Sequence, residues 1–258
     1  MKLSLLRIAS VTLLCLFAGA TAAHADTFSI QWYTAPTGSP DFYNGVNVPI
    51  GTSTNYVAST LGPDGLPVFN PGFTSATGTV LAPNSIYLNS STNELLYWTP
   101  TATNNIKADG PATTISLSTD PNNPTVMYPP TLGTDANFEA TAVISGSFTV
   151  LANQSDTVTF NVGADDTAFV YVNGNLVEDL GGIHGDTSLP SSTDTYGPGT
   201  YNIQIFYADH DVTAAALSFS DNSNLTITPT LPTPEPSTLM LLGTGLIGAA
   251  GAIRRRIR

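Results

Sequence analysis

Cysteine and positive charge are almost absent from the central part of the chain. The 258 residues contain one cysteine, Cys15, which lies in an N-terminal segment that we predict to be removed. The mature chain therefore has neither disulfide bonds nor a thiol nucleophile. Six of the seven lysines and arginines lie in the two terminal segments, which leaves Lys107 as the only lysine or arginine between them.

Negative charge, in contrast, is concentrated in the central part. All of the 19 Asp and Glu residues except Glu235 precede the C-terminal segment. A body of this charge repels nucleic acid and anionic lipid headgroups and attracts divalent cations, so we predict no nucleic-acid partner. Scattered acids are explained by the solubility of an extracellular domain, and only clustered acids call for a functional explanation.

Motifs of the common enzyme classes are missing as well. The sequence has no H-E-x-x-H zinc motif, no G-x-S-x-G nucleophile elbow and no Gly-rich phosphate loop. His184 and His210 are the only histidines outside the N-terminal segment, and their spacing does not favour the alternative of a zinc hydrolase. A glycosidase needs only two carboxylates, so a glycan-acting hydrolase stays open. We predict no catalytic residue.

The N-terminal segment, residues 1–25, has the three parts of a secretory signal peptide. Lys2 and Arg7 precede an apolar run, residues 8–20, and Ala23-His24-Ala25 follows it. Alanines at these two positions are typical of a cleavage site. We predict that signal peptidase cuts after Ala25 and that the mature protein is exported.

The C-terminal segment combines a Pro-rich spacer, residues 230–236, an apolar stretch, residues 237–253, and a basic end, residues 254–258. We predict that the apolar stretch is a transmembrane helix in the inner membrane. The arginines place its end in the cytoplasm and the central part outside. A simple tail anchor is one interpretation of this order.

A second interpretation comes from the three residues before the apolar stretch. Pro234, Glu235 and Pro236, followed by the helix and the arginines, resemble the PEP-CTERM sorting signal. The resemblance implies that a membrane-embedded exosortase cuts near this motif, so that anchoring in the inner membrane is transient. It also implies release or transfer to the cell surface of a Gram-negative bacterium that produces exopolysaccharide.

The central part has the composition of an all-β protein. Gly, Pro, Asn, Ser and Thr separate short runs of β-branched and aromatic residues, and helical periodicity is hard to find. We predict an antiparallel β-sandwich. Residues 26–137 are expected to be β-rich with long loops, and residues 138–229 to form the better defined core of the sandwich.

The first of these parts offers weak strand patterns at FSIQWY, SIYLN, NELLYW and TTISLS. Its large aromatic residues are Trp32, Tyr33, Tyr97 and Trp98. They could form a sugar-stacking surface, but we expect them in the core, because large rings dominate the burial that a sandwich can achieve.

A two-residue turn fixes the register of one hairpin in the second part. Asn173-Gly174 separates TAFVYV from NLVEDL, and this pair of residues favours the positive φ angles of a type I′ turn. The expected opposite pairs are Val172–Asn175, Val170–Val177 and Ala168–Asp179. This register places Asp179 on the face of Asp166, and Glu178 on the other face beside Phe169.

Two adjacent carboxylates, Asp165 and Asp166, precede the first strand of that hairpin. Successive side chains of a regular strand point to opposite faces, so the backbone must bend if both are to bind one ion. Side by side they repel by a few kcal/mol, at about 4 Å and an effective dielectric near 20. A divalent cation turns this repulsion into attraction, and calcium fits because it binds oxygen ligands in irregular geometry.

The stretch FNVGADDTAFVYVNGNLVEDLGGIHG, residues 160–185, resembles the calcium-binding core of the protective-antigen-type β-sandwich domains, and most of all their fibro-slime branch. Such domains occur in adhesins, flocculins, glycosidases and toxins. The resemblance implies that a cis peptide joins Asp165 and Asp166, and that their calcium holds sugar hydroxyls.

A second acidic cluster lies in the stretch FYADHDVTAAALSF. Asp209 and Asp211 occupy a loop between two strands, and in the family the loop in this region approaches the metal or ligand. A solvated turn is the alternative, because Asp tolerates tight backbone conformations. We therefore take Asp165, Asp166, Asp179, Asp209 and Asp211 as candidate metal ligands.

Two histidines complete the candidate ligand-binding set. We expect Asp165 and Asp166, together with His184 and His210, to contact the bound ligand; for His184 the alternative is a hydrogen-bonding role in the loop after Gly181-Gly182. The function that follows is a secreted, calcium-dependent carbohydrate-binding protein, an adhesin or a component of an exopolysaccharide matrix. A purely structural envelope protein with a stabilising calcium and an extracellular glycan hydrolase are the alternatives.

Overall fold

The computed structural model describes residues 27–39, 41–42, 47–74, 82–120, 122–131, 138–190, 192–211, 213–221 and 226–230. The predicted signal peptide, the cleavage-site residue Ala25 and the segment with Pro234, Glu235 and Pro236 lie outside these residues. No helix within the described ranges is long and apolar enough to cross a membrane. The predicted transmembrane stretch, residues 237–253, is not among them.

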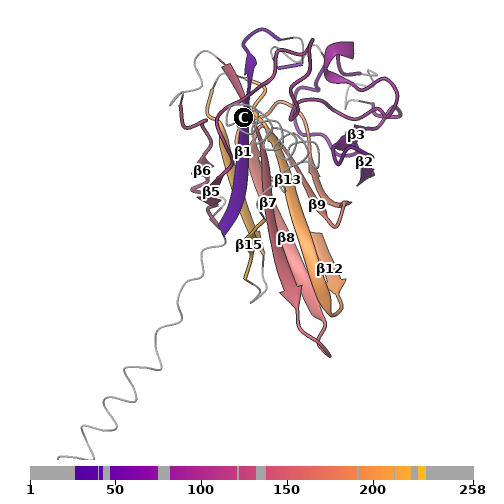
Figure 1. Cartoon of the computed structure of the whole chain (residues 1–258), viewed down its shortest axis with the longest axis vertical. Helices are drawn as coiled ribbons and strands as arrows, with labels where there is room; N and C mark the ends of the chain where they lie inside the picture. The colour runs from indigo at the N-terminus through magenta and orange to yellow at the C-terminus, as the bar shows by residue number, and fades with distance from the viewer. Residues whose placement is uncertain are drawn as a thin grey trace, which may run out of the picture.

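Two antiparallel sheets form the fold, which confirms the prediction of an all-β sandwich (Figure 1). The strands of the larger sheet are β1 (Thr27–Pro36), β2 (Val57–Leu61), β3 (Pro67–Phe69), β4 (Lys107–Ala108), β5 (Thr113–Ser116), β7 (Phe138–Val150), β9 (Thr167–Val172), β10 (Asn175–Leu180), β13 (Gly199–Ala208) and β15 (Thr228–Pro229). Those of the smaller sheet are β6 (Thr125–Val126), β8 (Asp156–Asp165), β11 (Thr187–Ser188), β12 (Ser192–Tyr196) and β14 (Ala216–Asp221).

The strand order brings both halves of the sequence into one sheet. The larger sheet has the order β3-β2-β10-β9-β13-β7-β1-β4, with β5 beside β1 and β15 beside β7. The smaller sheet has the order β11-β8-β14-β6, with β12 beside β8. Because β1 lies between β7 and β4, the predicted division at residue 137 is not a boundary between separate sheets.

A first core fills the space between the two sheets. Val158, Phe160 and Val162 of β8 point into it, as their alternation with polar residues predicts. They pack with alternate residues of β7, β9, β13 and β14. Trp32 of β1 is also buried here.

A second core lies on the other face of the larger sheet, under the loops of the first half of the chain. It contains Tyr97 and Trp98, with Tyr33 half-buried against it. The expectation that the large aromatics of this half pack into the core is thus confirmed for these residues and for Trp32. Strand β9 is buried on both faces, because Phe169 points into the second core and Val170 into the first.

Two of the strand predictions in the first half were wrong. SIYLN forms the 3-10 turn η1 (Ser85–Tyr87), and NELLYW contributes only isolated bridges at Glu94 and Leu95. In both stretches the large residues face the second core, so tertiary burial rather than a strand explains the apolar pattern. FSIQWY and TTISLS do form strands, in β1 and β5.

Candidate metal and ligand site

The Asp165–Asp166 pair lies where the chain crosses from one sheet to the other. Asp165 ends β8 in the smaller sheet and opposes Ala216, whereas Thr167 begins β9 in the larger sheet and opposes Ala208. The peptide bond between the two aspartates is cis, as the resemblance implied. Both side chains are buried, with 7% of Asp165 and 1% of Asp166 exposed.

The carboxylate of Asp166 ties together two loops that follow different strands. Its Oδ1 accepts a hydrogen bond from the backbone N–H of His184 at 2.7 Å, and its Oδ2 accepts one from the N–H of His210 at 2.8 Å. His184 lies in the loop after β10 and His210 in the loop after β13. Asp166 therefore positions both loops around the pair.

The loop after β10 is supported from both sides. Thr167 Oγ1 donates to the carbonyl of Gly182 at 3.1 Å, and Gly182 N–H donates back to the same hydroxyl at 3.2 Å. On the other side, Ile183 N–H donates to the carbonyl of Pro49 at 2.8 Å. Gly182 has a φ of 107°, and a Cβ there would lie 2.1 Å from the carbonyl oxygen of Gly51, so only glycine fits.

His184 has a structural contact within this loop. Its Nδ1 lies 3.0 Å from the carbonyl oxygen of Gly185, and the ring is half-buried. Burial lowers the pKa of His184 below its ordinary value. The ring is therefore neutral at pH 7. The backbone N–H of the same residue is the group that donates to Asp166.

The side chain of His210 points into the protein rather than toward solvent. Its Nδ1 donates to the carbonyl of Asp41 at 2.8 Å, and its ring stacks on Phe42 at a centroid distance of 5.2 Å. Only 1% of the residue is exposed, and burial lowers its pKa to about 4. His210 therefore supports the loop and is not presented to a ligand in solution, in contrast to the prediction.

Asp209 and Asp211 flank His210 and differ in exposure. Asp209 is fully buried, its N–H donates to the carbonyl of Ala140 at 2.9 Å, and its Oδ1 accepts from the N–H of Asp211 at 3.3 Å. Asp211 is exposed, and its charge contributes to the raised pKa of Asp165. The loop after β13 thus brings a second pair of carboxylates toward the first.

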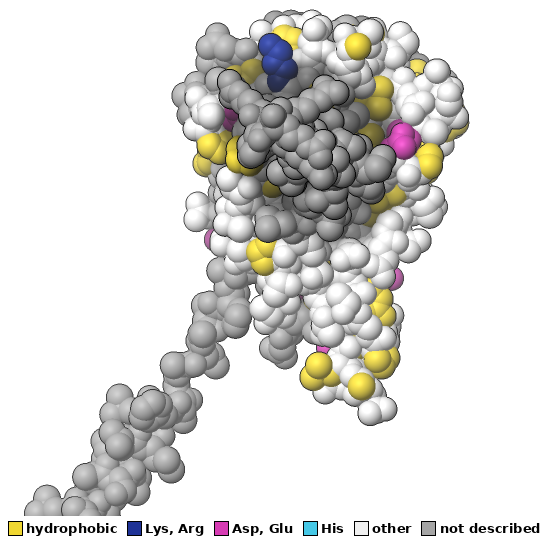
Figure 2. Space-filling model, viewed as in Figure 1, with side chains coloured by type: hydrophobic (Ala, Val, Ile, Leu, Met, Phe, Trp, Pro, Cys, Tyr) yellow, Lys and Arg dark blue, Asp and Glu magenta, His cyan; other side chains and the backbone are white. Residues whose placement is uncertain are grey.

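Burial is the main electrostatic feature of the Asp165–Asp166 pair. It raises the pKa of Asp165 to about 6 and that of Asp166 to about 7, and a hydrogen bond joins the two side chains. The charges of Asp186 and Asp211 raise the pKa of Asp165 further. Lys107 is the only lysine or arginine in the described part of the chain, and the one Lys/Arg patch visible in Figure 2 lies at the top of that view. Lys107 is not among the groups that shift the pKa values of the pair.

The hairpin register differs from the prediction beyond the turn. Asn173 and Gly174 have positive φ and Asn175 opposes Val172, as expected. The register then shifts between Leu176 and Glu178, which leaves Val177 as an extra, bulged residue. Val177 packs against the first core, so burial of this residue accounts for the shift.

The bulge exchanges the faces of the next two residues. Asp179 opposes Phe169 and Glu178 opposes Val170, so the prediction that Asp179 shares a face with Asp166 was wrong. Asp179 Oδ2 instead lies 3.5 Å from the N–H of Val57, and burial raises the pKa of Asp179 to about 7. Its carboxylate therefore fastens β10 to the segment before β2.

The donor atoms of the pair suit a hard cation. Carboxylate oxygens are the ligands that calcium prefers, and calcium also accepts backbone carbonyls and water. Over the described part of the chain, no three His, Cys, Asp or Glu side chains gather into a group able to hold a metal ion. A calcium here would therefore take side-chain ligands from Asp165 and Asp166 and complete its coordination with backbone carbonyls and water.

Two contributors to the site were missed at the level of sequence. Tyr207 Oη donates to the carbonyl of Asp165 at 2.6 Å, and Asp41 orients His210 through its carbonyl. Tyr207 lies two residues before Asp209, so its place at the end of an apolar strand could have indicated the contact. Asp41 lies more than a hundred residues away in the sequence and had no such indication.

Comparisons with known proteins identify two parts of the chain. Residues 232–256 match the PEP-CTERM protein-sorting motif, which includes Pro234, Glu235 and Pro236. Residues 101–229, half of the chain, match the PA14 domain. No curated protein matches the chain.

Solved structures with local similarity include a PA14 sugar-binding domain from an RTX adhesin, with 28% identity and a TM-score of 0.30 over 34% of this chain and 50% of that one. They also include the PA14 domain of an antifreeze protein, with 16% identity and a TM-score of 0.28 over 38% of this chain and 55% of that one. A β-glucosidase from Kluyveromyces marxianus in complex with glucose has 13% identity and a TM-score of 0.31 over 43% of this chain and 13% of that one.

The chain thus spans about half the length of the first two of these structures. The match to the PA14 domain includes the Asp165–Asp166 pair and both loops that Asp166 ties together, and the sorting motif follows it directly. The chain belongs to the PA14 domain family and carries a PEP-CTERM sorting motif at its C-terminal end.

Proposed function

We propose that this protein is a cell-surface carbohydrate-binding protein whose ligand site is built around a calcium ion at Asp165 and Asp166. The observation that carries the proposal is the buried pair itself, two adjacent carboxylates whose pKa values are raised by burial and whose shifts involve no lysine or arginine of the described residues. A divalent cation compensates both the repulsion between the two charges and their burial. An ion with vacant coordination positions can in turn accept the hydroxyl oxygens of a sugar.

The surroundings of the pair support a binding role rather than catalysis. Asp166 uses both carboxylate oxygens to hold the backbones of His184 and His210, which is a positioning function. His210 is enclosed and neutral at pH 7, so it is not placed to exchange protons with a substrate. We infer that the protein binds glycans without turnover, as an adhesin or as a component of an exopolysaccharide matrix.

The sorting motif supports export to the outside or the surface of the cell, and the proposed binding activity would act there. We propose that signal peptidase removes residues 1–25 and that an exosortase cuts near Pro234, Glu235 and Pro236 after transient anchoring in the inner membrane. A surface of a Gram-negative cell that carries its own exopolysaccharide would present the ligand to the exported domain.

A glycan array tests the proposal. The exported protein should bind in calcium a subset of glycans that it does not bind in excess EDTA, and it should regain this subset when calcium is restored. Asp166→Asn should abolish the calcium-dependent signal. Glu178→Gln, the same kind of change at a carboxylate that accepts the N–H of Ser192 instead, should preserve it. Calcium binding without any glycan signal would instead support a structural protein stabilised by calcium. Release of sugar from a bound glycan would support a hydrolase.

A further inference from the structure

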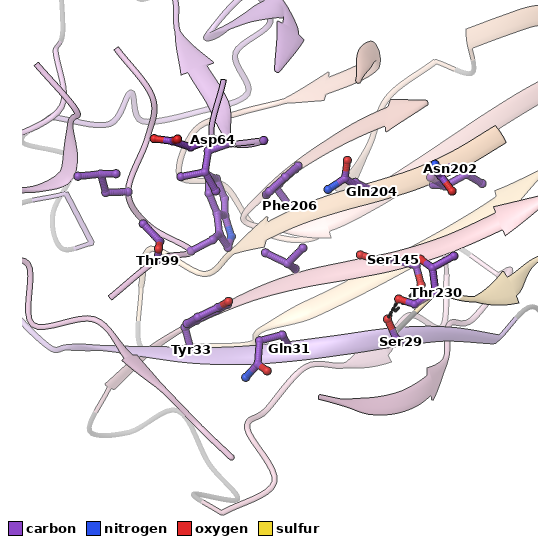
Figure 3. A pocket seen from close by; sticks show the side chains of 16 residues that line it. Ser29, Gln31, Tyr33, Asp64, Thr99, Ser145, Asn202, Gln204, Phe206 and Thr230 are labelled. Atoms are coloured by element: carbon purple, nitrogen blue, oxygen red, sulfur yellow. Dashed lines mark hydrogen bonds between the residues drawn. The ribbon is translucent and has the colours of Figure 1, made fainter. Parts of the chain in front are cut away.

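The outer face of the larger sheet carries a groove that is separate from the aspartate pair. Three neighbouring strands form its floor, β1, β7 and β13, and the turn between β2 and β3 forms one wall together with residues 96–99. Figure 3 shows the polar side chains of this floor in a row across the strands. The groove has a volume of about 1040 Å³, which is at the upper end of the sizes common for ligand sites.

Strand alternation explains why this floor is polar. On each of the three strands, alternate residues point into the first core, such as Ile30, Ile144 and Ile205. The residues between them point outward, and there they are polar, with Ser29 opposite Ser145 and Ser145 opposite Gln204. Ser29 is only 2% exposed and its hydroxyl donates to the Thr230 carbonyl, so the accessible part of this row is formed by Ser145 and Gln204, on neighbouring strands about 4.8 Å apart.

The floor offers hydrogen-bonding groups that are held in place. The amide Nε2 of Gln31 donates to the carbonyls of Trp32 and Gly110, at 3.0 and 3.1 Å, so its carbonyl oxygen is the group left for a ligand. Gln204 is half-buried, and its amide points along the floor beside Phe206 and Asn202 (Figure 3). An amide can both donate to and accept from the neighbouring hydroxyls of a sugar.

The charge and the aromatic content of the groove narrow the class of ligand. Among the sixteen described residues that line it, Asp64 alone carries a formal charge, and it is negative. An anionic ligand would therefore find no counter-charge in the lining. Tyr33 is half-buried at the groove, so part of its ring can pack against the C–H face of a sugar.

We propose that this groove is a second binding site, for a neutral oligosaccharide, and that it works without a metal ion. It is built on other strands and other residues than the aspartate pair, so it goes beyond the function proposed above. Two independent glycan sites on one domain would allow the protein to bridge polysaccharide chains.

The test is isothermal titration of the exported protein, in excess EDTA, with three probes: cellohexaose, maltohexaose and an alginate hexasaccharide. We expect binding of at least one neutral probe and no binding of the anionic alginate. Gln204→Ala should weaken that binding about fivefold, the loss of one hydrogen bond of ordinary strength. Gln154→Ala is the matched control, because Gln154 is exposed in the loop between β7 and β8, and it should leave the affinity unchanged.

A second variant keeps the test decisive if Gln204→Ala does not fold. Asn202→Ala changes an exposed residue of the same floor, and it should weaken binding as well, with an unchanged thermal midpoint. The proposal is overturned if neither neutral probe binds in EDTA, if alginate binds equally well, or if Gln204→Ala and Asn202→Ala both bind like Gln154→Ala.

Discussion

Replacing Asp166 by asparagine should change the stability in opposite directions with and without calcium. The side chain is 1% exposed, and its two carboxylate oxygens accept the N–H groups of His184 and His210. Asparagine keeps one acceptor oxygen and turns an NH2 group toward the other N–H, which costs about 1–3 kcal/mol. Against this, the change removes the repulsion from Asp165, which is about 4 kcal/mol at 4 Å and an effective dielectric of 20.

In the absence of calcium the second effect is the larger one. Above the raised pKa values of the pair, at about pH 8, we expect Asp166→Asn to be as stable as the parent or up to about 3 kcal/mol more stable. In calcium the order reverses, because an ion at a thousandfold excess over its Kd adds about 4.1 kcal/mol to the parent, which exceeds that gain. The variant lacks one of the two carboxylates and should gain far less.

Urea denaturation of both proteins, in calcium and in EDTA, measures this reversal. Glu178→Gln is the control, since Glu178 Oε1 accepts the N–H of Ser192 at 2.8 Å and glutamine retains that oxygen. Its free energy of unfolding should stay within about 1 kcal/mol of the parent in both conditions. If Asp166→Asn loses the same free energy with and without calcium, the pair does not hold the ion and the reasoning fails.

Three further predictions concern pH, one glycine and processing. In EDTA the melting temperature should fall as the pH rises from about 4 to about 8. Asp165, Asp166 and Asp179 have raised pKa values in the folded protein, so their protonated forms stabilise the fold at low pH. This stability is complete below the ordinary aspartate pKa and is lost as the pH rises through about 6 to 7. The lowered pKa values of His184 and His210 oppose this trend, but they are outnumbered by the acids with raised pKa values, which also include Asp41 and Glu178. A melting temperature that rises steadily over the range would contradict the prediction. Gly182→Ala should destabilise the protein by more than about 1–2 kcal/mol, because of the positive φ and the close carbonyl of Gly51. Gly185→Ala in the same loop has no atom within 4 Å of the added Cβ and should melt like the parent. Equal melting curves of the two variants would count against the loop geometry. In the native host, mass spectrometry of the surface protein should find no peptide beyond the Pro234–Pro236 region, and peptides that end at Arg258 would refute sorting by cleavage.

The sequence predicted best those features that depend on neighbours along the chain. The alternation of Val158, Phe160 and Val162 identified β8, and Asn173-Gly174 identified the hairpin turn. Strand β9 is an uninterrupted apolar run because it is buried on both faces. These patterns require only the period of a strand and the conformational preferences of a turn.

Features that depend on distant partners could not be predicted in the same way. The bulge at Val177 follows from packing against the first core, whereas the local sequence is equally compatible with a regular pairing without a bulge. The enclosure of His210 depends on Asp41 and Phe42, which belong to the other half of the chain. The groove brings together strands whose residues are separated by more than a hundred positions in the sequence, so the groove itself could not be predicted. Its polar floor was partly visible, because Ser145, Ser147 and Thr149 alternate with buried residues along β7.

The central claim is that Asp165 and Asp166 together bind calcium. Isothermal titration of the exported protein with calcium, after removal of divalent ions, tests it most directly. The account predicts a saturable binding heat at about pH 8 that weakens at least about tenfold, or about 1.4 kcal/mol, in Asp166→Asn and is unchanged in Glu178→Gln. No binding heat in the parent, or the same affinity in the parent and in Asp166→Asn, would contradict it.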